Sequence, residues 1–166
     1  MRTSWIHCLV LSLSLFAAAS AEAGIEVRWS LIFRDAEILG WGGHMKLVAG
    51  TLEPGASISQ HVTIYDVQNF LSAHGPADWT MTLQDRGVDA TDVAMRGRDD
   101  SPRFVNVTWT YHGTARITAP ADLGSIGFTI AAPGDTGPAA PFRYVSQTSG
   151  QDGPFNLSGY ALGIAH

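Results

Sequence analysis

Strict alternation of apolar and polar residues is the feature of this sequence that most limits its fold. Between residues 25 and 33 the apolar positions are Ile25, Val27, Trp29, Leu31 and Phe33. Residues 104–111 repeat the pattern with Val105, Val107, Trp109 and Tyr111. Because successive side chains of a β-strand point to opposite faces, period two predicts strands with one buried face. After residue 23 only one turn, within residues 66–75, has helical spacing, so an all-β fold is predicted.

Shorter segments continue this pattern along the chain. Further strands are expected at residues 46–52, 57–65, 79–83, 114–118, 126–130, 142–147 and 155–164. Three glycines at positions 40, 42 and 43 are expected to interrupt the chain after the first strand. His112-Gly113 is expected to close a hairpin between residues 104–111 and 114–118. About nine short strands without crossover helices predict an antiparallel two-sheet β-sandwich, with a β-barrel as the alternative.

The alternation also predicts which side chains fill the space between the sheets. They are the apolar members of the alternating segments: Ile25, Val27, Trp29, Leu31, Val62, Ile64, Trp79, Met81, Leu83, Val105, Val107, Trp109, Ile126 and Phe128. A shift of one residue would turn a whole strand's set toward solvent, so the assignment should hold strand by strand. His61 lies between apolar residues of its strand and is expected to be exposed.

The first residues have the organisation of a secretory signal peptide. Arg2 precedes an apolar stretch at residues 9–16, and small residues follow as far as Ala23. Residues 1–23 are therefore expected to be removed on export, and residues 24–166 to form one secreted domain, extracellular or periplasmic. Cys8 is the only cysteine of the chain, so packing rather than disulfide bonds must stabilise that domain.

The charge balance argues against two classes of partner. Fifteen acidic and ten basic residues give a net charge of -5, and Lys46 is the only lysine. Nucleic acids and anionic membranes attract basic faces, so neither is an expected partner. No segment after residue 23 is apolar for the length that a membrane-spanning helix needs. The expected partner is an extracellular protein or a polysaccharide.

Residues 85–103 form the most charged stretch of the sequence and are expected to be a long loop. It contains the candidate metal ligands Asp85, Asp89, Asp92, Asp99 and Asp100. Carboxylates and loop carbonyls are the oxygen ligands that Ca²⁺ requires, although the spacing is not that of an EF-hand. Four arginines alternate with these aspartates, so a solvated loop with compensated charge is the simpler interpretation, and no cofactor is expected.

Trp41 and His44 are the candidate ligand-binding residues. A tryptophan presented on a glycine-rich loop can stack on a sugar ring, whereas the alternative is a plug over the end of the sandwich. The sequence has no G-x-S-x-G elbow, no phosphate-binding glycine loop and no H-E-x-x-H motif, so catalysis is not expected. A structural, adhesive or ligand-binding module is the expected function. A calcium- or glycan-binding domain is one alternative, and a small secreted hydrolase is another.

Four strand-and-turn motifs resemble those of exported bacterial proteins of the PEP-CTERM-associated type. They are residues 62–66 (VTIYD), 78–80 (DWT), 106–113 (NVTWTYHG) and 123–128 (LGSIGF). The resemblance implies export to the cell surface or extracellular matrix and supplies no catalytic residues. The family's sorting tail carries a Pro-Glu-Pro motif, which residues 159–166 lack, so anchoring by that route is not expected.

Overall fold

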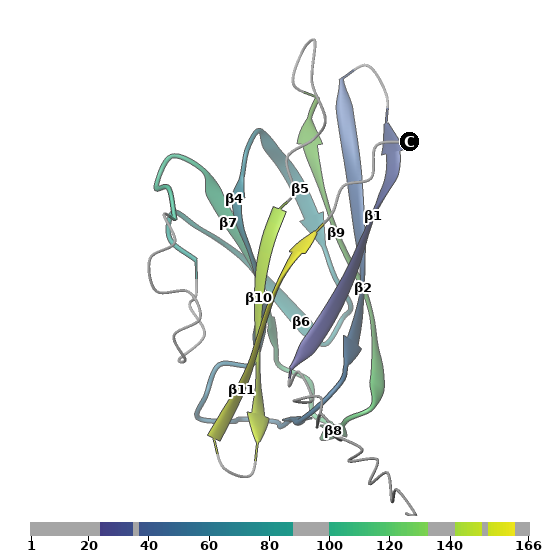
Figure 1. Cartoon of the computed structure of the whole chain (residues 1–166), viewed down its shortest axis with the longest axis vertical. Coiled ribbons are helices and arrows are strands. Elements are labelled where there is room, and N and C mark those ends of the chain that lie inside the picture. Colours follow the sequence, from purple (N-terminus) through teal and green to yellow (C-terminus); the bar gives the residue numbers. More distant parts are fainter. Residues whose placement is uncertain (1–23, 35–36, 88–99, 133–141, 151–152, 162–166) are drawn as a thin grey trace, which may run out of the picture.

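The computed structural model describes residues 24–34, 37–87, 100–132, 142–150 and 153–161. These residues form strands connected by turns and loops, with no helix among them. Two antiparallel sheets face each other without closing into a barrel, so the predicted all-β sandwich is confirmed (Figure 1). The expected signal peptide, residues 1–23, lies outside the described residues.

One sheet has four strands in the order β1-β2-β9-β5. These are β1 (Ile25–Arg34), β2 (Ile38–Leu47), β9 (Ala121–Ala131) and β5 (Phe70–His74). The central pair is long, since β2 and β9 pair antiparallel from Ile38 opposite Ala131 to Leu47 opposite Ala121, with one register shift between Met45 and Lys46.

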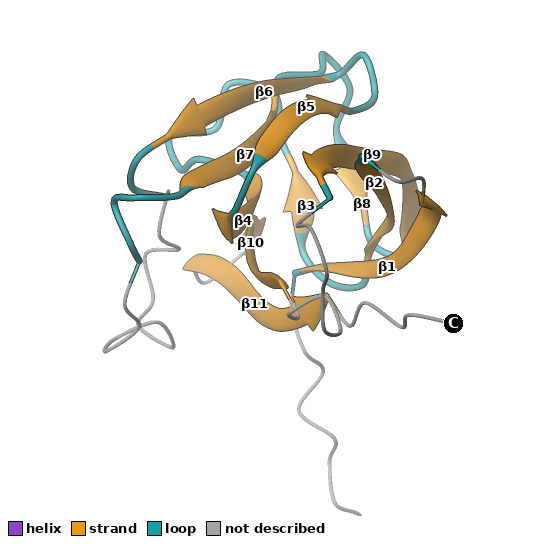
Figure 2. Cartoon of the chain, turned by 90° about the horizontal axis from the view of Figure 1, so that it is seen from above, coloured by secondary structure: helices purple, strands orange, loops and turns teal. Residues whose placement is uncertain are grey.

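The second sheet has seven strands. Six follow the order β6-β7-β4-β10-β3-β8, and β11 pairs with β10 on the edge opposite β4. They are β6 (Trp79–Gln84), β7 (Val105–Tyr111), β4 (His61–Val67), β10 (Phe142–Gly150), β3 (Thr51–Leu52), β8 (Ile117–Thr118) and β11 (Gly153–Ala161). Seen from above, the two sheets enclose the core between them (Figure 2).

Aromatic side chains from both sheets meet edge to face in the core. Phe128 on β9 lies 5.6 Å from Trp29 and 5.0 Å from Phe142, and Phe142 lies 5.6 Å from Trp41 (centroid distances). Nine of the predicted core residues are buried: Ile25, Val27, Val62, Ile64, Trp79, Val107, Trp109, Ile126 and Phe128. Four others, Trp29, Leu31, Met81 and Val105, are partly buried. The prediction for Leu83 is wrong, because its side chain is 47% exposed at the edge strand β6.

Side chains from the second sheet cover the outer edge of β1. The Ser146 hydroxyl accepts the Ile25 N–H at 3.0 Å and donates to the Ile25 carbonyl at 2.8 Å. The Tyr144 hydroxyl accepts the Val27 N–H at 3.2 Å. These backbone groups of an edge strand therefore have partners within the sandwich, which joins the two sheets on this side.

Three expectations about connections are wrong. Residues 66–75 contain the strand β5 rather than a helical turn. Asn69, with a φ angle of 53°, lies in the turn before β5, and Asp66, with a φ angle of 56°, lies at the register shift near the end of β4. No hairpin joins β7 to β8, since β7 pairs with β4 and β6 whereas β8 pairs with β3. Residues 46–52 divide between the end of β2 and the short β3. In each case pairing with a distant strand decides the outcome, and local spacing does not contain that information.

Candidate functional site

Trp41 lies inside β2 and not on a loop, so the expected chain break is wrong. Its side chain is 1% exposed, and it stands between Leu31 and Phe128 in the register of the four-stranded sheet. The neighbouring glycines serve close packing rather than a turn. A Cβ on Gly43 would lie 2.7 Å from a Val27 methyl carbon. The buried indole offers no surface for stacking on a sugar.

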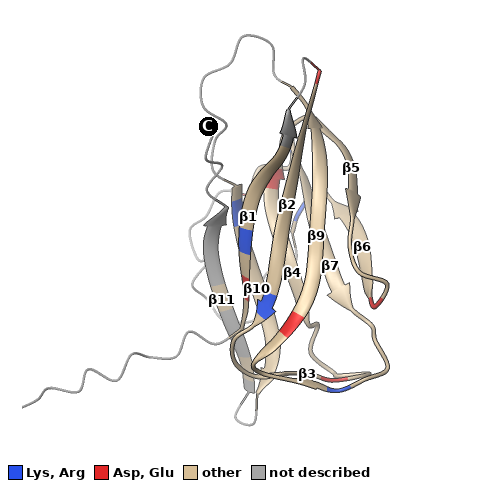
Figure 3. Cartoon of the chain, turned by 90° about the vertical axis from the view of Figure 1, so that its right-hand side faces the viewer, with Lys and Arg blue, Asp and Glu red and all other residues tan. Residues whose placement is uncertain are grey.

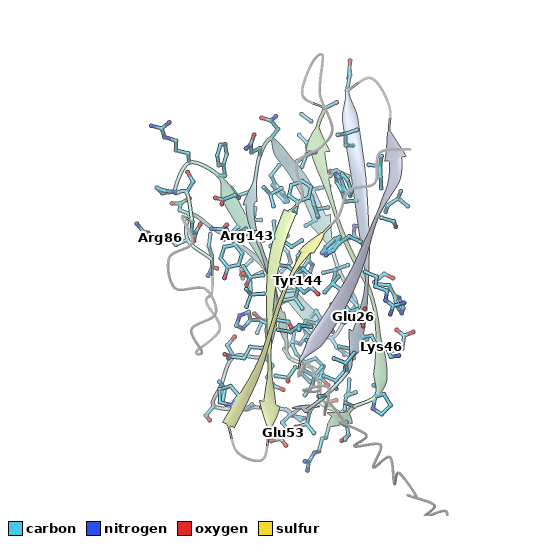
Figure 4. All side chains as sticks on the ribbon, viewed as in Figure 1. Glu26, Lys46, Glu53, Arg86, Arg143 and Tyr144 are labelled. Atoms are coloured by element: carbon cyan, nitrogen blue, oxygen red, sulfur yellow. The ribbon has the colours of Figure 1, made fainter. Side chains whose placement is uncertain are left out.

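His44 lies on the outer face of the same sheet and is exposed. Its Nε2 atom is 3.2 Å from Asp122 Oδ2, and the two side chains are 52% and 68% exposed. The register of β1, β2 and β9 places Arg28 opposite His44 and Glu26 opposite Lys46, which in turn stands opposite Asp122. We call Glu26, Arg28, His44, Lys46 and Asp122 the polar face. Figure 3 shows basic residues along β1 and β2 and an acidic residue on β9, and Figure 4 labels Glu26 and Lys46.

Charges of opposite sign alternate across the polar face. Arg28 Nε donates to Glu26 Oε1 at 2.8 Å. This hydrogen bond and the Glu26 charge raise the pKa of Arg28, so its guanidinium stays positive. Because all these groups contact solvent, the ion pairs add little to stability and remain available to an external ligand.

Glycines continue the outer face beyond His44. Gly42 and Gly127 stand opposite each other in the register of β2 and β9. A Cβ on Gly42 would lie 2.8 Å from Ile32 Cδ1, and a Cβ on Gly127 would collide with the His74 ring. The Ile32 side chain, which is 59% exposed, therefore lies over Gly42, and the exposed His74 ring lies over Gly127. These two side chains border the polar face.

The expected calcium loop is described only at its two ends. Asp85 is exposed, whereas Asp89, Asp92 and Asp99 lie outside the described residues. Asp100 Oδ1 accepts a hydrogen bond from Asn106 Nδ2, and its Oδ2 accepts the Gly87 N–H, both at 2.8 Å. Asp100 therefore fixes the loop end to β7. In the part of the chain that the structure describes, no three His, Cys, Asp or Glu side chains meet as a metal ion would require.

Asp66 and Asn106 extend this attachment and were missed from sequence. The Asp66 N–H donates to Asn106 Oδ1 at 2.8 Å, and Asp66 Oδ1 accepts the Ser101 N–H at 2.9 Å. Both residues have the character of ordinary turn or strand residues when the sequence is taken alone. The available signal is that Asp and Asn tolerate positive φ and bond to nearby backbone.

A second polar group is buried on the outer face of the seven-stranded sheet. His61, predicted to be exposed, is fully buried, and its Nδ1 lies 3.2 Å from the Ser59 carbonyl. Gln147 Nε2 donates to the same carbonyl at 2.6 Å. The prediction is wrong because it assumed solvent over this face, whereas Thr63 and Tyr65 on the same face of β4 are buried as well. Gly87 packs on this face, since a Cβ there would collide with the buried Tyr65 ring.

Comparisons with known proteins identify no relative. No family model, no curated protein and no solved structure matches the chain. Among the residues placed by the structure, no helix has the length and apolar character to cross a bilayer.

Proposed function

We propose that this protein is a non-catalytic exported module that binds an extracellular polysaccharide through its polar face. The observation that carries the proposal is the arrangement of five charged or ionisable side chains from three adjacent strands on one solvated surface. Their donors and acceptors alternate over neighbouring register positions, which suits the many hydroxyl groups of a sugar polymer. The resemblance to PEP-CTERM-associated proteins supports a place at the cell surface or in the extracellular matrix.

The neighbouring surface complements this chemistry. Sugar rings have apolar C–H faces as well as hydroxyls, and the exposed Ile32 side chain beside the polar face offers an apolar contact. An open sheet surface fits an extended chain better than a small molecule, which usually requires a concave pocket. Binding would therefore be distributed over several weak contacts, with structural and adhesive consequences rather than chemical conversion.

Binding to polysaccharides with and without the polar side chains tests the proposal. The full chain is screened against a glycan array, and each hit is measured by isothermal titration calorimetry. His44→Ala and Arg28→Ala should each weaken binding by about fivefold to tenfold, which corresponds to the loss of roughly one ordinary hydrogen bond. Thr118→Ala, an exposed change on β8 of the other sheet, is the matched control and should leave the affinity unchanged.

Two results would contradict the proposal. One is the absence of binding to any polysaccharide on the array, and the other is equal binding by the parent and both polar-face variants. Export is tested separately by intact-mass analysis of the secreted protein, which should begin near Gly24. A secreted chain that retains residues 1–23 would contradict that part of the proposal.

A further inference from the structure

The outer edge of β6 is open in the part of the chain that the structure describes. This strand ends the seven-stranded sheet and pairs only with β7. The Tyr111 N–H on β7 donates to the Gln60 carbonyl on the β4 side, at 2.9 Å. Backbone groups alternate in direction along a strand, so the neighbouring residues of β7, including Thr110, face β6. The even-numbered residues of β6, such as Thr80, direct their backbone N–H and C=O groups toward these residues of β7. Met81 and Leu83 therefore direct their N–H and C=O groups away from the sheet.

Other edges of the sandwich carry protection that β6 lacks. The N–H groups of Ile25 and Val27 on β1 are bonded by side chains from β10. The edge strand β5 has an irregular register between Phe70 and Ser72. β6 has the sequence WTMTLQ, which contains no charged residue and no proline, and its pairing with β7 is regular throughout. Regular, uncharged edges of this kind accept further strands.

We propose that β6 pairs with β6 of a second copy of this chain, antiparallel about a two-fold axis at Thr82. Such pairing extends the seven-stranded sheet continuously from one copy into the other. Met81 of each copy then exchanges backbone hydrogen bonds with Leu83 of the other. Thr82 stands opposite Thr82 of the second copy as the pair without hydrogen bonds. The Leu83 side chain, exposed in one chain, is covered at this interface.

Side-chain complementarity selects this register. On the core side, Met81 of one copy lies opposite Leu83 of the other. Just beyond the strand, the same register brings Asp78, in the turn before β6, toward Arg86 of the second copy, in the bend after β6, twice by symmetry, and both residues are exposed. A two-fold axis at Met81 instead would place Asp78 opposite Gln84 and Arg86 opposite Pro76, so neither residue would stand opposite one of opposite charge.

The neighbouring edge of the other sheet adds apolar surface on the same side. β5 lies beside β6 (Figures 2 and 3), and its Leu71 side chain is 50% exposed. This interface goes beyond the proposed polysaccharide contact and does not depend on it, because the polar face lies on β1, β2 and β9. A dimer formed through β6 leaves the polar face of each copy open, which would give an extended polymer two points of attachment.

Single cysteines test the register directly. In full-length protein carrying Cys8→Ser, Thr82→Cys should form a disulfide-linked dimer under mild oxidation, because opposed Cα atoms in a pair without hydrogen bonds are about 4.5 Å apart. Thr80→Cys is the matched control. In the proposed register, two copies of residue 80 are offset by about 13 Å along the strands and cannot be linked. Cross-linking of both variants to the same extent would overturn the proposal.

Charge reversal tests the same interface without a covalent bond. Sedimentation equilibrium of the parent should show a reversible dimer, and Asp78→Arg or Arg86→Asp should each raise its dissociation constant about tenfold. The double variant restores both opposite-charge pairs and should recover the parent value. Melting temperatures equal to that of the parent show that the variants fold. A parent that is monomeric throughout, or a double variant no better than the single ones, would overturn the proposal, whatever the result for polysaccharide binding.

Discussion

The Ser146 hydroxyl joins the two sheets at one side of the sandwich, and Ser146→Ala measures how much this contact stabilises the fold. Ser146 is fully buried, and its Oγ atom bonds both the N–H and the carbonyl of Ile25, at 3.0 Å and 2.8 Å. Alanine removes the partner of two backbone groups at an edge strand. An unsatisfied buried group costs about 1–3 kcal/mol, so leaving both groups unsatisfied should lower the free energy of unfolding by about 2–6 kcal/mol.

Thr148 provides the matched control two residues further along β10. Its side chain is also fully buried, but its hydroxyl has no hydrogen-bond partner in the described structure. Thr148→Val replaces that hydroxyl by a methyl group of similar size and should raise the free energy of unfolding by about 1 kcal/mol. The two hydroxyl deletions, on the same face of one strand, should therefore change the free energy of unfolding in opposite directions.

Equilibrium urea denaturation of both variants is the assay, with the slope m unchanged from the parent. A Ser146→Ala variant as stable as the parent would refute the reasoning, because it would mean that water or a small shift of β1 satisfies Ile25 at no cost. A destabilised Thr148→Val variant would show instead that its hydroxyl has a partner in the folded protein.

Three further predictions concern packing, the loop end and pH. Gly43→Ala should lower the free energy of unfolding by about 1–3 kcal/mol in urea denaturation, since the added Cβ would lie 2.7 Å from a methyl carbon on β1. Asp100→Ala should destabilise the chain and speed proteolytic cleavage between Gly87 and Asp100, whereas EGTA should leave the melting temperature of the parent unchanged, because both Asp100 oxygens already accept hydrogen bonds. Burial and the Asp78 carboxylate raise the pKa of Tyr111. The native state therefore holds that proton more tightly than the unfolded chain, so the free energy of unfolding should fall as pH rises above about 10. In urea denaturation at several pH values, the Tyr111→Phe variant should lose less stability than the parent over this range.

The success of the strand predictions depended on how local the relevant signal was. Residues 25–33 and 104–111 alternate over their whole length, and both are strands with the expected faces toward the core. The glycines around Trp41 carried a misleading signal, because a glycine that admits a neighbouring side chain has the same sequence appearance as one that makes a turn. That distinction depends on Val27 and Ile32, which reach Gly43 and Gly42 from the adjacent strand.

The candidate site was the less predictable part. His44 was singled out from sequence, but of the other polar-face residues only Lys46 shares its strand, the rest come from β1 and β9, and Asp122 lies far from it along the chain. Without the register of three strands, no spacing rule brings these side chains together. Asp100 was singled out only as a candidate metal ligand and Asn106 not at all, whereas the structure makes Asn106 a hydrogen-bond partner of both Asp66 and Asp100.

The sequence alone determined the strand content, the two-sheet class and the identity of most of the core, because alternation acts over a few residues and burial follows from it directly. Tertiary structure decided which strands pair, which sheet edges are covered and which polar side chains share a surface. Leu83 and His61 show the difference, since local pattern predicted one as buried and the other as exposed. An edge position leaves Leu83 exposed, whereas His61 is buried beside Gln147 of the neighbouring strand, which bonds the same Ser59 carbonyl, and both outcomes depend on contacts between residues far apart in the chain.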